Sequence, residues 1–107
     1  RRVQENAGGG TDHGYGNVMM ALGARVNGGQ VYGTFPGLAN ANLYQGTDVA
    51  VTTDYRRIIS EALIRRMANP NIYYVFPGYS GYTPMGVFQG TDLPPTGYDA
   101  LFASGFD

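Results

Sequence analysis

The residues best suited to chemistry in this sequence are Asp12 and His13, which stand side by side in the glycine-rich stretch Gly9-Gly10-Thr11-Asp12-His13-Gly14. His13 is the only histidine, and the chain has no cysteine. Aspartate offers a hard oxygen and histidine a borderline nitrogen, a mixture that suits divalent Zn, Mn or Fe. Adjacent side chains can share one ion only where the backbone turns, and Gly8-Gly9-Gly10 before the pair with Gly14 and Gly16 after it allow such a turn. Asp12 and His13 are therefore the first candidates for metal ligands in this sequence.

A catalytic metal site also needs at least one further protein ligand and an open position for water or substrate. The sequence offers only weak candidates for that ligand: Asp48, Asp54, Asp92 and Asp99. The tripeptide Gly-Thr-Asp occurs at residues 10–12, 46–48 and 90–92, and it forms a good turn without any metal. A hydrogen-bonded or surface histidine in a glycine loop is therefore the alternative interpretation of His13.

Two arginines open the sequence, and a guanidinium group can bind an anion through two parallel hydrogen bonds. We consider Arg1 and Arg2 as anion-binding residues for this reason, with an ordinary surface role as the alternative. They could also suggest a twin-arginine export signal, but no hydrophobic stretch follows them.

The composition limits the classes of partner. The chain has 107 residues, enough for one domain with a modest core, and its formal charge is -1. Arginine supplies all seven cationic side chains, and no basic patch favours a nucleic-acid or anionic-membrane partner. No apolar run approaches the roughly 20 residues of a membrane span. The seventeen glycines, nine tyrosines and five phenylalanines indicate a loop-rich globular chain.

The clearest predicted element is an amphipathic helix over residues 54–67. Arg57, Glu61 and Arg65 form i,i+4 pairs on one side, and we expect this side, with Arg56 and Arg66, to face solvent. Asn69-Pro70 ends the helix. Apolar residues recur at helical spacing on the other side, which we expect to pack: Tyr55, Ile58, Ile59, Ala62, Leu63 and Met67.

Short apolar runs between turn residues predict two to four strands. Residues 17–23 are typical of a strand buried on both faces, and residues 30–33 and 72–76 could form further short strands. The remaining segments, 1–16 and 34–48, are expected to be loops. Residues 79–107 form an irregular tail rich in glycine, proline and aromatic residues. This inventory is typical of the C-terminal part of a larger α/β sheet protein, so we treat residues 1–107 as one segment of such a protein.

Several motifs appear in an order that resembles a known family. They are Arg1-Arg2, Glu5-Asn6, the Asp12-His13 stretch, and then Gly28-Gly29-Gln30-Val31-Tyr32-Gly33, Phe35-Pro36-Gly37-Leu38 and Thr52-Thr53-Asp54-Tyr55-Arg56. Over about residues 1–78 the chain resembles the C-terminal part of a large bacterial family of unknown function (domain of unknown function one-five-zero-one). Members of that family carry twin-arginine export signals and are related to the alkaline phosphatase and sulfatase superfamily.

The resemblance implies a fold, a cofactor and a location. The fold would be the C-terminal segment of an alkaline-phosphatase-like three-layer α/β sandwich, in a periplasmic or extracellular protein. Asp12 and His13 would bind a divalent metal such as Zn or Mn, as the superfamily's Asp-His pair does at a sheet edge. The superfamily's nucleophile and first acidic ligands lie upstream of this segment. The superfamily also commonly uses another histidine after the Asp-His pair, and this sequence has none after His13. A site with one metal, or a degenerate site, is therefore an alternative to a two-metal centre.

Two function classes follow from these observations. The first is part of an exported, metal-dependent hydrolase of phosphate or sulfate esters, whose partner would be the missing N-terminal part of the same protein or a second copy. The second is a non-catalytic extracytoplasmic structural or interaction protein that uses its aromatic tail as an interface. The aromatic residues of the tail could instead cover the chain's own core. They are Tyr79, Tyr82, Phe88, Tyr98, Phe102 and Phe106.

Overall fold

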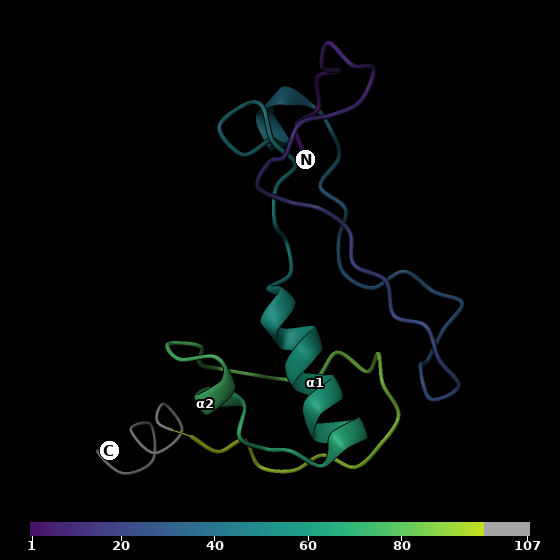
Figure 1. Cartoon of the computed structure of the whole chain (residues 1–107), viewed down its shortest axis with the longest axis vertical. Helices are drawn as coiled ribbons and strands as arrows, with labels where there is room; N and C mark the ends of the chain where they lie inside the picture. The colour runs from purple at the N-terminus through teal and green to yellow at the C-terminus, as the bar shows by residue number, and fades with distance from the viewer. Residues whose placement is uncertain (98–107) are drawn as a thin grey trace. The chain divides into compact units, whose positions relative to one another are not determined.

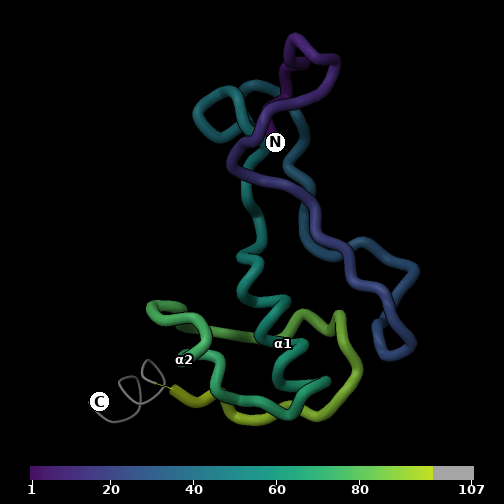
Figure 2. The backbone as a smooth tube through the Cα atoms, in the orientation of Figure 1, coloured from purple at the N-terminus to yellow at the C-terminus, as the bar shows by residue number. Residues whose placement is uncertain are grey.

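The structure is a computed structural model that describes residues 1–97 of the chain (Figure 1). It contains a short 3₁₀ helix, η1 (Asn40–Asn42), and two α-helices, α1 (Tyr55–Met67) and α2 (Ile72–Val75). Extended segments of the described chain form isolated antiparallel bridges but no continuous strand. Most of the backbone is therefore loop, as Figure 2 shows. The loop-rich character and the single long helix were both predicted from the sequence.

The chain divides into two compact units that alternate along the sequence. The first unit comprises Arg1–Met20 and Gly33–Asp54, and the second comprises Ala21–Tyr32 and Tyr55–Asp107. The predicted metal ligands lie in the first unit, and both α-helices lie in the second. Within the described residues, no helix is long and apolar enough to cross a membrane.

Helix α1 confirms the predicted helix, but it packs through the opposite side. The residues that it buries are Ser60, Glu61 and Ile64, which lie on the side expected to face solvent. Two residues of the predicted apolar stripe are largely exposed: Tyr55 is 60% and Met67 69% accessible. The other four members of the stripe are only partly buried. The polar side packs because it supplies hydrogen bonds that the neighbouring loop requires.

The buried Glu61 carboxylate joins α1 to the loop of residues 85–88. Its Oε1 accepts hydrogen bonds from the backbone N–H groups of Met85 at 2.5 Å and Gly86 at 2.8 Å, and its Oε2 accepts one from Phe88 at 2.7 Å. Figure 1 shows this later part of the chain running around α1. Glu61 thus satisfies three backbone donors that no strand or helix satisfies.

Three arginines of α1 bind other residues of the segment that includes this loop. Arg57 donates from Nε to the carbonyl of Thr83 at 2.6 Å and from Nη2 to that of Pro84 at 3.1 Å. Arg66 donates to the carbonyl of Gln89 at 3.1 Å. Arg65 donates to the carbonyl of Phe88 at 3.0 Å and to both carboxylate oxygens of Asp92, at 2.7 and 3.0 Å. The prediction that these arginines face solvent is therefore wrong for Arg57 and Arg65, which are partly buried, whereas Arg66 is exposed as predicted.

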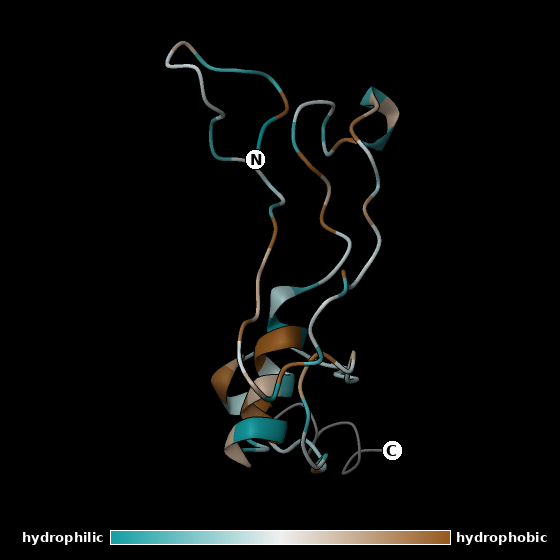
Figure 3. Cartoon of the chain, turned by 90° about the vertical axis from the view of Figure 1, so that its right-hand side faces the viewer, coloured by the Kyte–Doolittle hydropathy of each residue, from teal (hydrophilic) through white to brown (hydrophobic). Residues whose placement is uncertain are grey.

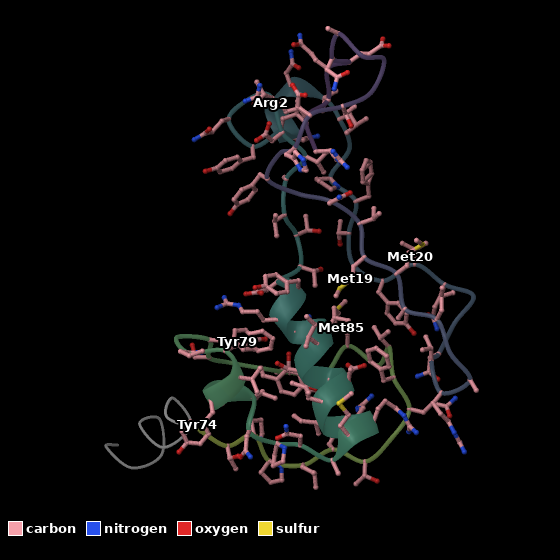
Figure 4. The ribbon with its side chains drawn as sticks, in the orientation of Figure 1. Arg2, Met19, Met20, Tyr74, Tyr79 and Met85 are labelled. Carbon is pink, nitrogen blue, oxygen red and sulfur yellow. The ribbon has the colours of Figure 1, made fainter. Side chains whose placement is uncertain are left out.

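The segment predicted as a strand over residues 72–76 instead forms helix α2. Its adjacent residues Ile72 and Tyr73 are both buried, whereas adjacent strand residues point to opposite faces. Because the core lies on one side only, a helical turn can bury both. They pack with Ile64 and Tyr79, and Figure 4 shows where Tyr79 lies. Leu63, Phe76, Tyr82 and Leu93 pack around this cluster.

The described part of the aromatic tail packs on its own unit. Tyr79 is only 7% exposed and belongs to the core, and Tyr82 packs against it. Phe88 is partly buried and forms an isolated bridge with Val26. Tyr98, Phe102 and Phe106 lie outside the described residues.

The other two predicted strands do not form. Residues 17–23 contain no strand, and their apolar side chains are exposed instead of buried: Val18 is 84%, Met20 83% and Leu22 91% accessible. Residues 30–33 contain no strand either, and Val31 is 94% exposed. A strand needs a neighbouring strand for its backbone hydrogen bonds, and the described chain supplies none to these segments. Figure 3 shows hydrophobic residues in the loop segments as well as on α1.

The buried carboxylate predicts a stability effect for Glu61→Gln. The amide keeps the size of the side chain but places an NH₂ donor where the carboxylate accepts backbone N–H groups. We expect the free energy of unfolding to fall by about 2 kcal/mol, measured by urea denaturation with circular dichroism. Glu5→Gln at an exposed position is the matched control, with an expected change within about 0.5 kcal/mol. Equal effects of the two substitutions would contradict this role of Glu61.

Tyr82 predicts a loss of stability at high pH. Burial, and then the negative charge of Glu61, raise the pKa of Tyr82 from 10.0 to about 12. A tyrosine with a raised folded-state pKa stabilises the fold fully below pH 10 and loses that contribution as the pH rises toward 12. Its hydroxyl is buried without a hydrogen-bond partner among the described residues. Tyr82→Phe should therefore change the unfolding free energy by less than about 1 kcal/mol at pH 7.

The same Tyr82→Phe variant should lose less stability than the parent chain between pH 10 and 12. Urea denaturation at both pH values measures this difference. Titration of tyrosine absorbance at 295 nm should show that the variant lacks one high-pKa component. If the absorbance titration of the variant equals that of the parent chain, Tyr82 is not the source of the stability loss at high pH.

Candidate metal site

The predicted ligands Asp12 and His13 lie in the first unit, on a loop that is attached to a second segment of the same unit. The Val3 N–H donates to the carbonyl of Thr47 at 3.0 Å, and the Val49 N–H donates to that of Arg1 at 2.9 Å. Between these bonds, Arg2 and Asp48 form an isolated antiparallel bridge. These contacts fix the base from which the glycine-rich loop projects.

Asn6 organises the loop and orients the carboxylate of Asp12. Its Oδ1 accepts hydrogen bonds from the backbone N–H groups of Gly8 and Gly10, each at 3.0 Å. Its Nδ2 donates to Oδ1 of Asp12 at 3.1 Å. The backbone of Asp12 is also tied, because its carbonyl accepts a hydrogen bond from the Arg2 N–H at 3.2 Å. One carboxylate oxygen of Asp12 is therefore held by Asn6.

Both predicted ligands are exposed at the surface of their unit. Within the described chain, His13 has no hydrogen bond or ion pair that would occupy its ring nitrogens. Its imidazole is accordingly open to an external group. Both side chains are thus accessible, and carboxylate oxygens and imidazole nitrogens are ligands that divalent cations use.

Gly14 and Gly16 have a different role from the one predicted for them. We expected them to provide backbone freedom, but they allow close approach of two chain segments. A Cβ atom on Gly14 would lie 2.6 Å from the backbone of Arg1, and one on Gly16 would lie 2.5 Å from the carbonyl oxygen of Val49. Only residues without a Cβ fit at these two positions.

The two candidate anion-binding residues lie beside the same loop. Arg1 donates from Nη1 to the carbonyl of Thr11 at 3.1 Å. The guanidinium Nε of Arg2 lies 3.6 Å from Oδ1 of Asp48. Arg2, labelled in Figure 4, has a side chain that is 56% exposed, whereas that of Asp48 is 16% exposed. The structure thus brings both arginines to the loop that carries the pair, and each retains N–H donors beyond these contacts.

The candidates for a third ligand are not gathered around the pair. Among residues 1–97, no group of three or more His, Cys, Asp or Glu residues is arranged to hold a metal ion. Asp48 belongs to the same unit but pairs with Arg2, and Asp54 lies at the end of that unit. Asp92 pairs with Arg65 in the second unit, and Asp99 lies outside the described residues. Among the described residues no third ligand stands with Asp12 and His13, and their role as metal ligands stays a prediction.

Sequence reasoning did not identify Asn6 as the residue that orients Asp12. A usable signal was present, because an asparagine side chain commonly binds the backbone N–H two residues later in an Asx turn. Here Asn6 precedes Ala7 and three glycines, and such a backbone can bend back onto the side chain. Asn6 is therefore a positioning residue for the carboxylate of Asp12.

Comparison with known proteins identifies one family. A protein-family model described as "Protein of unknown function (DUF1501)" matches residues 1–69. This region contains the Asp12-His13 loop, the whole first unit and all of α1. No curated protein and no solved structure matches the chain significantly.

The close approach at Gly16 predicts a local stability effect. Gly16→Ala would place its methyl group 2.5 Å from the Val49 oxygen and 3.0 Å from that of Ala50, so the two segments must separate. We expect a cost of about 1–3 kcal/mol, seen as faster hydrogen exchange of the Val49 amide. Gly10→Ala is the matched control, because its methyl group would meet its nearest neighbour at 3.9 Å. Similar exchange in both variants would contradict the packing at Gly16.

Proposed function

The chain belongs to this family of proteins of unknown function, and from that premise we propose that it is part of an exported metal-dependent hydrolase of phosphate or sulfate esters. In this proposal Asp12 and His13 ligate a divalent metal such as Zn or Mn. The observation that carries it is the adjacent exposed carboxylate and imidazole on a fixed loop, with the carboxylate oriented by Asn6. Orienting partners of this kind are typical of metal-binding side chains.

The rest of the proposal depends on the resemblance to the alkaline phosphatase and sulfatase superfamily. That resemblance implies a three-layer α/β sandwich, a bacterial protein and a periplasmic or extracellular location. In the superfamily the nucleophile and the first acidic ligands precede the segment that resembles this chain. With only two ligands proposed in this segment, the remaining ligands would come from another part of the protein.

The residues of this chain would have separate tasks in such a site. A bound divalent metal would stabilise negative charge on an ester oxygen and activate a nucleophile. Asp12 and His13 would hold the metal, and Asn6 would keep the carboxylate in place. Arg1 and Arg2 would offer guanidinium donors to the phosphate or sulfate group. A surface role for these arginines is the alternative.

Metal titration of the chain tests the ligand assignment directly. Addition of Mn²⁺ should broaden NMR signals around residues 12–14 first, and Zn²⁺ should compete for the same position. Asp12→Asn and His13→Ala should each weaken binding at least about tenfold, and Asn6→Ala should weaken it about tenfold. Asp92→Asn is the matched control, because Asp92 also follows Gly-Thr but has no adjacent histidine. Binding that survives both Asp12→Asn and His13→Ala would refute the assignment.

Activity is tested separately with the full-length protein. Hydrolysis of aryl phosphate or aryl sulfate esters should require the metal and should be lost in His13→Ala. Metal binding without hydrolysis would retain the ligand assignment and remove the hydrolase function. Hydrolysis that is unchanged in His13→Ala would remove the role of this pair in the reaction.

An interaction role is the second candidate, and exposed apolar residues favour it. Val18, Met20 and Phe35 of the first unit are 84%, 83% and 68% exposed; Met20 is labelled in Figure 4. Such side chains are commonly covered in an assembly, either with another part of a longer protein or with a second copy. The described aromatic residues of the tail support this role less, because Tyr79 and Tyr82 pack on their own unit. If light scattering shows only monomers, a second copy of the chain does not cover these residues.

A further inference from the structure

The second unit contains a hollow that the metal-site proposal does not use. It has a volume of about 270 Å³ and is lined by Leu22, Gly23, Ala24, Arg25, Val26, Arg66 and Phe88. This volume lies just below the roughly 300–1,000 Å³ of sites that enclose drug-sized ligands. A ligand of this hollow would therefore be small.

Hydrogen bonds hold the walls of the hollow in place. Val26 and Phe88 form an isolated antiparallel bridge. On one side of it, the Asn27 N–H donates to the carbonyl of Val87 at 2.8 Å; on the other, the Gln89 N–H donates to that of Arg25 at 2.9 Å. The Phe88 N–H in turn binds the buried carboxylate of Glu61. The two chain segments are thus fixed to each other and to α1 before any ligand arrives.

The residues that line the hollow include three with large apolar side chains and two arginines. Leu22, Val26 and Phe88 provide the apolar part, and Leu22 is 91% exposed. Arg66 uses one nitrogen for the carbonyl of Gln89. Within residues 1–97, no carboxylate forms an ion pair with Arg25 or Arg66. Arg65, which precedes Arg66 in α1, differs in this respect, because it forms an ion pair with Asp92 at 2.7 Å.

We propose that this hollow binds a small organic anion that carries an apolar body. The acid group, a carboxylate, sulfonate, sulfate or phosphate, would accept hydrogen bonds from Arg25 and Arg66, because a guanidinium fork matches such oxygens. The apolar body would cover Leu22, Val26 and Phe88. Two unmatched positive charges beside an apolar surface favour an anion over a neutral ligand. The site is independent of Asp12 and His13.

The test uses naphthalene-2-sulfonate as the probe and NMR of the amide groups as the readout. We expect titration to shift the amide signals of residues 22–26 and 88. The neutral analogue naphthalene-2-sulfonamide should bind at least about five-fold more weakly, and inorganic sulfate alone should not bind measurably. The factor of five corresponds to about 1 kcal/mol, the upper range for an exposed ion pair.

Arginine variants identify the groups that recognise the anion. Arg25→Met and Arg66→Met keep an unbranched side chain and remove the charge, and each should weaken sulfonate binding about five-fold. Arg56→Met is the matched control, because it removes the same charge from the same helix but does not line the hollow. Arg66→Met also removes the bond to Gln89, so Arg25→Met provides the independent test.

Three results would overturn the proposal. The first is equal affinity for the sulfonate and the sulfonamide, which would leave only an apolar surface. The second is unchanged sulfonate binding in Arg25→Met and Arg66→Met. The third is a set of shifts spread over exposed apolar residues elsewhere, such as Val18 and Phe35, without a local response at residues 22–26.

Discussion

The buried carboxylate of Glu61 is the interaction on which the second unit depends. A carboxylate without exposure to water is costly unless its oxygens are satisfied, and here three backbone N–H groups at 2.5–2.8 Å satisfy them. Those N–H groups have the same requirement, because the loop of residues 85–88 has no strand to pair with. The carboxylate and the N–H groups thus offset each other's cost of losing contact with water. The bridge between Val26 and Phe88, and with it the hollow, is built on this loop.

The helix over residues 54–67 could be predicted because helical spacing and Pro70 define it locally, whereas its packing side could not. A hydrophobic stripe usually marks the buried face, yet α1 buries Ser60 and Glu61. Arginines of the same helix bind carbonyl groups more than 20 residues away in the chain. A local pattern cannot contain that information, because the loop's unpaired carbonyl and N–H groups exist only in the folded unit. The same reason explains why residues 72–76 were expected to form a strand: burial of two adjacent residues depends on where the core lies.

At the candidate site the sequence could predict the pair but not its surroundings. Asp12 and His13 were recognisable by residue type, and the family match over residues 1–69 includes them. The carboxylate's partner Asn6 lies six residues earlier, and its role depends on a turn closed by Gly8 and Gly10. The glycines after the pair were interpreted as sources of flexibility. They are steric requirements instead, because a methyl group at either Gly14 or Gly16 would enter the backbone of a facing segment.

The alternation of the two units along the chain has a consequence for synthesis on the ribosome. Residues 21–32 belong to the second unit, and their hydrogen bonds to Val87 and Gln89 span about 60 residues of sequence. This segment emerges early and must wait until its partners are translated, while residues 33–54 complete the first unit in between. Leu22 and Val31, exposed even in the folded chain, are unprotected throughout that interval. Nascent chains with such delayed contacts are the ones that chaperones engage.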